Sequence, residues 1–102
     1  MIEIVETRYG LAPFIICDVC QEPITDASLA LAAMRKGRMN EHGRREVFHV
    51  HKDKCFPIIE SSWSQLVDSV ELTRHLDLLI QNAGVSLGDL REERDSYGKA
   101  GL

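Results

Sequence analysis

The sequence lacks the features that mark secreted, membrane-spanning or disordered proteins. Its three cysteines are few and odd in number, which argues against a disulfide framework. The longest apolar runs, residues 14–17 and 27–34, fall far short of the roughly 20 residues that a membrane-spanning helix needs. The first ten residues show no basic stretch followed by an apolar one, so we expect no signal peptide and a cytoplasmic location.

Composition and net charge exclude further classes of protein and of binding partner. The chain has 102 residues, enough for one domain or for a small module with an appendage. Hydrophobic residues make up 44% and charged residues 27%, which is ordinary for a globular protein and excludes wholesale disorder. The net charge of -4 excludes a general electrostatic coat for nucleic acids, although a local basic patch remains compatible with it.

The spacing of cysteines and histidines predicts a metal site. Cys17 and Cys20 form a CxxC pair, and a His-x3-Cys pair, His51 and Cys55, follows after a long gap. Zinc prefers four tetrahedral ligands drawn from thiolates and imidazoles, and this set uses every cysteine of the chain. We therefore predict a zinc ion bound by Cys17, Cys20, His51 and Cys55. Cys55 should lie in a first helical turn, where the helix dipole favours a thiolate.

One ligand has an alternative. His49 projects from the same face of the predicted strand as His51, because side chains two apart share a face. We favour His51, since it lies nearer to Cys55 and at the expected junction of strand and helix. Two other interpretations compete with metal binding: Cys17 and Cys55 as small buried hydrophobic residues, and CDVC as a redox motif. The redox interpretation lacks the expected strand and helix context.

The pattern predicts an α+β chain whose N-terminal part holds the metal. We expect a strand near residues 1–9, a break at 10–13, a strand run at 14–17 and strands near 28–34 and 47–50. The glycines and charges of residues 35–45 indicate a loop between the last two strands. A helix should follow over about 54–61, with Asp53 as its N-cap and Pro57 in its first turn.

The C-terminal part should be helical. Asp68 to Glu71 reads as a capping box that begins a helix, and Asn82 with Gly84 should end it. The apolar stripe of that helix contains Leu72, Leu76, Leu79, Ile80 and Ala83. A short, charged last helix should begin near Ser86. We divide the chain into a zinc-finger module over 1–62, a helical appendage packed on it over 63–95 and a flexible tail over 96–102.

On these residues the chain resembles the treble-clef zinc-finger superfamily, and in particular its LIM-like Cys-Cys-His-Cys modules. The matching motifs are C17-D-V-C20 and H51-K-D-K-C55, preceded by Phe48 and Val50. The resemblance covers about residues 14–62 and implies a zinc knuckle, a β-hairpin and a helix that donates the last ligand. The gap of thirty residues between Cys20 and His51 is longer than is usual in LIM half-modules, the His-x3-Cys spacing differs from the commoner His-x2-Cys, and a single ligand set replaces the two of a LIM domain.

A metal site of this composition indicates a structural role. Three thiolates and one imidazole fill the coordination sphere and leave no position for a water molecule, which disfavours catalysis at the metal. We therefore expect a regulatory module that binds a protein partner. Trp63, Leu66, Val67 and Leu79 should either pack on the finger or form a surface for self-association, including a homodimer through the helical segment.

Two other functions stay open. The loop at residues 35–45 has five basic residues against one acidic residue and can contact phosphates, but it contains no aromatic side chain to stack on bases. Its basic residues are Arg35, Lys36, Arg38, Arg44 and Arg45. The third alternative is a metal-dependent nuclease of the HNH type, suggested by the sequence FHVH. The asparagine and histidine expected in the following helix are missing at their usual places.

Overall fold

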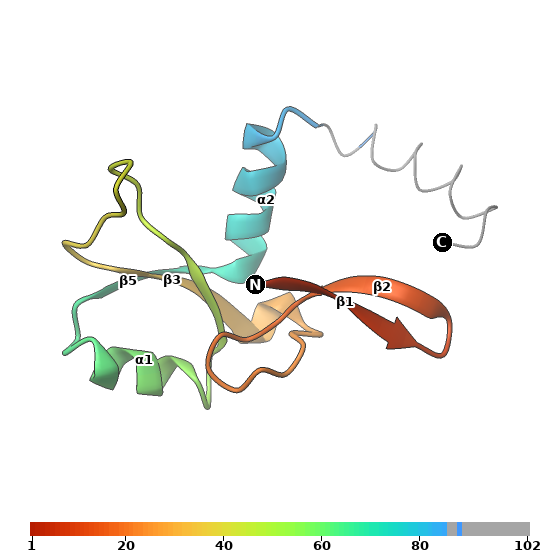
Figure 1. Ribbon diagram of the computed structural model, residues 1–102, viewed down its shortest axis with the longest axis horizontal. Helices are drawn as coiled ribbons and strands as arrows, with labels where there is room; N and C mark the ends of the chain where they lie inside the picture. Colours follow the sequence, from red (N-terminus) through yellow and green to blue (C-terminus); the bar gives the residue numbers. More distant parts are fainter. Residues whose placement is uncertain (86–87, 89–102) are drawn as a thin grey trace.

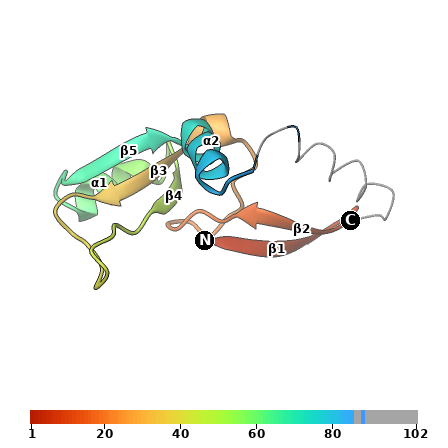
Figure 2. The same cartoon turned by 90° about the horizontal axis from the view of Figure 1, so that it is seen from above.

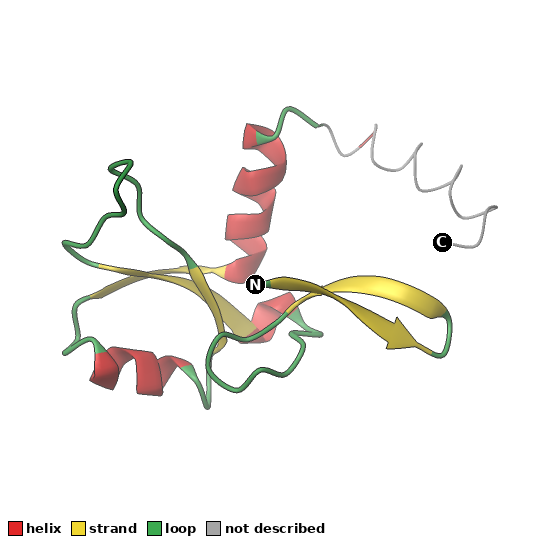
Figure 3. Ribbon diagram, in the orientation of Figure 1, coloured by secondary structure: helices red, strands yellow, loops and turns green. Residues whose placement is uncertain are grey.

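The computed structural model describes residues 1–85 and residue 88 of the chain. The chain forms a mixed α/β structure with two antiparallel sheets (Figures 1 and 3). Its elements in order are β1 (Ile2–Thr7), β2 (Gly10–Ile15), the short 3-10 helix η1 (Ala27–Leu29), β3 (Ala30–Arg35), β4 (Phe48–His51), α1 (Phe56–Ser62), β5 (Val67–Glu71) and α2 (Leu72–Asn82). The expected α+β class is therefore confirmed at this level. The last helix and tail predicted beyond residue 85 lie outside the described residues.

The N-terminal hairpin β1–β2 replaces the break that we predicted at residues 10–13. Thr7 pairs with Gly10 across a two-residue turn, and Gly10 adopts φ +113°, which only glycine adopts readily. In an antiparallel ladder, hydrogen-bonded and non-hydrogen-bonded residue pairs alternate. The backbone N–H of Ile16 donates to the carbonyl of Met1, so the Ile4–Pro13 pair falls at a position without hydrogen bonds. Pro13 therefore loses no bond by lacking an N–H, and the proline fits within the strand.

The second sheet has three strands in the order β4-β3-β5 and lies apart from the hairpin, with α2 between them (Figures 1 and 2). The hairpin predicted from residues 28–34 and 47–50 is confirmed by the pairing of β3 with β4, with Ala30 opposite His51. Ala30, Ala32 and Ala33 are completely buried. The small alanine side chains let other elements pack closely on both faces of this central strand, which outweighs the helix propensity of alanine.

The predicted capping box at Asp68 to Glu71 is wrong, because residues 67–71 form strand β5. This strand pairs with β3, with Val67 opposite Arg35 and Glu71 opposite Leu31. Pairing gives the central strand β3 a neighbour on both edges and buries part of Val67 and Val70. Tertiary pairing thus outweighs a local N-cap signal, and α2 begins three residues later than the capping box predicted.

The start of α1 differs from the prediction, whereas the end of α2 agrees with it. The N-cap of α1 is Cys55, with no side-chain cap bond, so the predicted cap at Asp53 is wrong, whereas Pro57 lies in the first turn as expected. At the C-terminus of α2, Gly84 adopts φ +77° and Val85 N–H donates to the carbonyl of Ile80 at 3.4 Å. Together with the bond from Gly84 to Gln81, this is a Schellman ending, as the glycine indicated.

The core draws on the three-stranded sheet, both helices and the segment that follows β2. Its buried cluster consists of Cys17, Ile24, Ala30, Ala33, Val50, Cys55, Ile59 and Leu72. Leu76, Trp63 and Val67 pack against it, whereas Leu66 and Leu79 are 53% and 51% exposed. Leu79, which we placed on the buried stripe of α2, therefore faces solvent in the described structure. Two of the four predicted metal ligands, Cys17 and Cys55, are part of the core, so the site and the packing depend on each other.

Candidate metal site

The first pair of candidate ligands lies in a tight turn between β2 and η1. The backbone N–H of Cys17 donates to the carbonyl of Glu22 at 2.9 Å, and Gln21 N–H returns to the carbonyl of Cys17 at 3.0 Å. Gln21 takes the left-handed conformation at φ +65° that lets the chain reverse here. The amide of Val19 points at the Cys17 sulfur, 3.4 Å away. The turn thus directs Cys17 and Cys20 to one side and surrounds a sulfur with N–H donors.

The second pair comes from the junction of β4 and α1. His51 is the last residue of β4, and Cys55 is the N-cap of α1. The ring Nδ1 of His51 lies 3.4 Å from the Cys20 sulfur and 3.8 Å from the Cys55 sulfur. The four ligand atoms of Cys17, Cys20, His51 and Cys55 all lie within 4.8 Å of one another. The fold therefore brings together the residues that the spacing singled out, although Cys20 and His51 are 31 positions apart in the sequence.

This geometry suits a tetrahedral metal ion. Zinc–sulfur bonds of about 2.3 Å and zinc–nitrogen bonds of about 2.0 Å place the ligand atoms of a tetrahedron roughly 3.5 to 3.8 Å apart. The two distances from His51 Nδ1 fall at that spacing. Three sulfurs and one imidazole are the donors that zinc prefers, and no disulfide joins any of the three cysteines. Cys17, Cys20, His51 and Cys55 can therefore hold a metal ion.

The thiols of this cluster are electrostatically unequal. Burial raises the pKa of Cys17, but hydrogen bonds from the backbone amides of Cys20 and Val19 outweigh it and bring the pKa from 9.0 to about 6. Burial together with the sulfurs of Cys17 and Cys20 raises the pKa of Cys55 to about 11. Burial and the two neighbouring sulfurs therefore oppose a thiolate at Cys55, whereas the dipole of α1 favours one. A bound cation is what would favour three thiolates at once.

The alternative ligand His49 lies outside the cluster. Its imidazole packs beside that of His75, with ring centroids 5.6 Å apart, and its Nδ1 is buried without a hydrogen-bond partner. Desolvation lowers the pKa of His49, as do the positive N-terminus and His75, and Asp18 opposes them. A neutral ring packed in the interior fits these surroundings. Within residues 1–85 and 88, the Cys3His cluster is the only group of three or more His, Cys, Asp or Glu side chains close enough together to hold a metal ion.

Sequence reasoning missed Asp18, which lies between the two cysteines of the turn. Its carboxylate Oδ2 accepts the backbone N–H of His49 at 2.8 Å, and its own N–H donates to the carbonyl of His49 at 2.9 Å. The N-terminal ammonium of Met1 lies 3.6 Å from the other carboxylate oxygen. A polar residue directly after the first cysteine of a CxxC pair is the signal that could have indicated this tether.

The five basic residues of the loop at 35–45 differ in what their side chains contact. Arg45 contacts Asp68 at 2.7 Å and Lys36 contacts the same carboxylate at 3.7 Å, which lowers the pKa of Asp68, with the hydrogen bond from Arg45 as the largest cause. Arg35 and Arg38 line a cavity at the base of the loop. Arg44 belongs to neither group. Its backbone N–H instead donates to the side chain of Asn40 at 3.0 Å, inside the loop.

No family model, curated protein or solved structure matches the chain. In the described part of the chain, no helix has the length and apolar character needed to cross a membrane.

Proposed function

We propose that this chain is a small binding module held together by a structural zinc ion, which Cys17, Cys20, His51 and Cys55 bind. The observation that carries the proposal is the convergence of three thiols and one imidazole from two separate segments within 4.8 Å. With all four positions occupied by protein ligands, zinc has no place for a reacting water molecule, so the ion stabilises the fold and does not catalyse. Structural zinc in small fingers contributes on the order of 10–16 kcal/mol of apparent binding free energy.

The arrangement supports a treble-clef-like assignment for the metal-binding half. A tight turn supplies the first two ligands, an antiparallel pair of strands follows, and a helix begins at the fourth ligand. The strand β5 and the N-terminal hairpin are additions to that plan. The ion would add to the two hydrogen bonds between Asp18 and His49 in fixing the turn against the β4–α1 junction.

A partner-binding role fits the surface as well as the metal site. Leu66 and Leu79 are more than half exposed and lie in the segment that follows α1. A protein partner, or a second copy of the chain in a homodimer, would cover such side chains at a favourable free energy. Reduced cysteines that bind zinc belong to a reducing compartment, which supports our expectation of a cytoplasmic location.

Metal content tests the zinc proposal directly. Native protein, purified without added metal, should contain one zinc ion per chain by elemental analysis. Replacement by cobalt should give the absorption bands of a tetrahedral thiolate site. A chelator should remove the ion and unfold the module, and zinc should refold it. Protein that carries no metal, and that neither binds added zinc nor changes its stability with a chelator, would overturn the proposal.

Self-association has its own test. Sedimentation of zinc-loaded protein over a range of concentrations should show a dimer, and Leu79→Glu should return it to a monomer while the zinc content stays at one. Thr73→Glu, on an exposed position of the same helix, is the matched control and should leave the dimer intact. A wild-type protein that stays monomeric at high concentration would remove the homodimer and leave the heterologous protein partner.

A further inference from the structure

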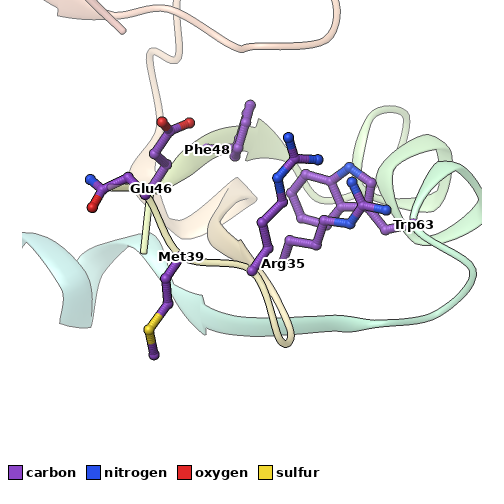
Figure 4. A pocket seen from close by; sticks show the side chains of 7 residues that line it. Arg35, Met39, Glu46, Phe48 and Trp63 are labelled. Atoms are coloured by element: carbon purple, nitrogen blue, oxygen red, sulfur yellow. The ribbon is translucent and has the colours of Figure 1, made fainter. Parts of the chain in front are cut away.

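A cavity lies at the base of the basic loop, at the opposite ends of β4 and α1 from the metal ligands. It has a volume of about 330 Å³, and Figure 4 shows its lining side chains. It is lined by Arg35, Arg38, Met39, Asn40, Glu46, Phe48 and Trp63. Small-molecule sites start near 300 Å³, so this cavity is large enough for one flat ring system and no more.

Two aromatic side chains form the apolar wall of the cavity. Phe48 and Trp63 meet edge to face, with ring centroids 5.2 Å apart and planes at 72°. Trp63 caps the C-terminus of α1, where its N–H donates to the carbonyl of Ile59 at 2.9 Å. The loop contains no aromatic residue in sequence, but the fold places two beside it. The main objection to nucleic-acid binding through this loop therefore does not hold.

Two guanidinium groups on the cavity have no partner of opposite charge among the described residues. No carboxylate there lies within 4.0 Å of Arg35 or Arg38, whereas Lys36 and Arg45 are both engaged by Asp68. Figure 4 shows the Arg35 side chain extending toward the side of Phe48 and Trp63, and Met39 directed the other way. A guanidinium presents a planar fork of donors that suits phosphate oxygens.

The loop itself is held in shape at Asn40. Its side-chain oxygen accepts the backbone N–H groups of His42 and Arg44 at 2.9 and 3.0 Å, and its own N–H donates to the carbonyl of Arg44 at 2.7 Å. The loop tip is thereby closed on itself, and residues 38–40 are presented to the cavity. The Asn40 amide group and the Glu46 carboxylate remain as a donor and an acceptor on the cavity wall.

We propose that this cavity binds a nucleobase together with its adjacent phosphate, either in a single-stranded nucleic acid or as a free nucleotide. The base stacks on the aromatic wall of Trp63, Glu46 accepts a hydrogen bond from an exocyclic amine, and Arg35 and Arg38 bind the phosphate. The cavity takes one unstacked base, which favours single strands over duplex. The cavity is distinct from the metal site, and it gives the zinc-binding module a nucleotide as its ligand.

The test uses the single tryptophan of the sequence, because Trp63 lies in the cavity. Zinc-loaded protein is titrated at low salt with short single-stranded oligonucleotides of mixed sequence, and with adenosine and uridine monophosphates. Two probes serve as ligand controls: an abasic phosphodiester strand of equal length and polyglutamate. The variants are the double change R35Q with R38Q, and R44Q as the matched control in the same loop. Zinc content is measured for each sample.

Stacking should quench the Trp63 fluorescence, and the R35Q/R38Q protein should bind at least tenfold more weakly while R44Q binds like wild type. For a single strand, two phosphate contacts predict that log K falls with log salt at a slope of about -1.4, which the double variant should bring close to zero. Quenching by strands, by mononucleotides or by both supports the site and identifies the source of the base.

Four results would overturn the inference. They are the absence of binding by any nucleotide probe at low salt, equal losses in R44Q and R35Q/R38Q, abasic strands that bind as tightly as normal ones, and polyglutamate that binds as tightly as the oligonucleotides. The last result would indicate an acidic protein partner instead. Nucleotide binding by a protein that proves to contain no metal would overturn the zinc proposal alone, since the cavity shares no residue with the ligand set.

Discussion

Asp18 and His49 exchange two hydrogen bonds that tie the CxxC turn to strand β4. The carboxylate of Asp18 accepts the His49 amide at 2.8 Å, and the Asp18 amide donates to the His49 carbonyl at 2.9 Å. Asp18 directly follows Cys17, and His49 lies two residues before His51. The tether therefore sets the distance between the two halves of the candidate metal site without using a ligand. Its charged acceptor is only 19% exposed, so water competes weakly for it.

Replacing Asp18 with alanine should weaken the fold without removing the metal. The change deletes the hydrogen bond from the partly buried His49 amide to a charged carboxylate, and the contact with the Met1 ammonium. Hydrogen bonds to charged groups contribute about 1.5–3 kcal/mol, so we expect a loss of that size in the free energy of unfolding. Urea unfolding of zinc-loaded protein measures the loss, and elemental analysis should still find one zinc ion per chain.

Asp18→Asn is the control for this prediction. Asparagine keeps an acceptor oxygen for the His49 amide and loses only the charge, so it should cost less than half as much as Asp18→Ala. Equal stability of Asp18→Ala and wild type would mean that the tether contributes nothing to the fold.

His51 and His49 provide a matched pair for the ligand assignment. They lie two residues apart on the same strand, and Nδ1 of His51 faces the sulfurs whereas the ring of His49 packs beside His75. His51→Ala should lower zinc affinity by more than about 100-fold, because changing residues that merely orient a ligand already costs 10–100-fold. Competition with a chromophoric chelator measures the affinity.

His49→Ala should keep one zinc ion and an affinity within about tenfold of wild type. It will lower stability through lost packing of a half-buried ring. Cys20→Ser, a ligand change outside the strand, should behave like His51→Ala. If His49→Ala releases the ion and His51→Ala retains it, the ligand assignment is wrong.

Asp68 joins the loop to strand β5, and its contribution should depend on pH in a defined sense. The hydrogen bond from Arg45 is the largest cause that lowers the pKa of Asp68 below 3.8. A depressed carboxylate pKa stabilises the fold above the unfolded value and loses that stabilisation as the pH falls through the lower folded value. The stability difference between wild type and Asp68→Asn should therefore stay constant from pH 7.5 to 5.5.

Salt distinguishes this ion pair from a neutral hydrogen bond. The two side chains are 37% and 44% exposed, so the difference between wild type and Asp68→Asn should be small and should shrink further as salt is added. Arg45→Gln should lose less than Asp68→Asn, because Lys36 still contacts the carboxylate, and the double variant should lose little more than Asp68→Asn alone. Urea unfolding at each pH and salt concentration provides the comparison. A difference that fades between pH 7.5 and 5.5 would contradict the lowered pKa.

The sequence predicted the β3–β4 hairpin through the metal pattern and not through local propensity. The alanines and leucines of residues 28–34 favour a helix, but bringing Cys17 and Cys20 to His51 and Cys55 requires a strand that returns the chain. The strand over 67–71 could not be predicted in this way. Asp68 to Glu71 carries a good N-cap signal, and only the free edge of β3 makes pairing more favourable than a helical turn.

The cavity shows the same limit for function. The positive charge of residues 35–45 can be read from the sequence. The position of Phe48 and Trp63 beside this loop cannot, because it depends on how β4 and the end of α1 pack. The hydrogen bonds of Asp18 likewise could not be predicted from the sequence, since their partner His49 lies 31 positions away. The sequence indicated which residues can bind a metal or a phosphate, and the fold determines which of them lie close together.

The ending of α2 offers a prediction that depends on backbone conformation alone. Gly84 takes φ +77°, and a Cβ atom added there would meet nothing within 4 Å. Gly84→Ala should therefore destabilise the protein by roughly 1–2 kcal/mol through left-handed strain and not through a clash. Gly84→Asn should cost less, because asparagine tolerates this conformation. Thermal unfolding of the zinc-loaded variants measures both, and an alanine variant as stable as wild type would show that the helix ends without the Schellman turn.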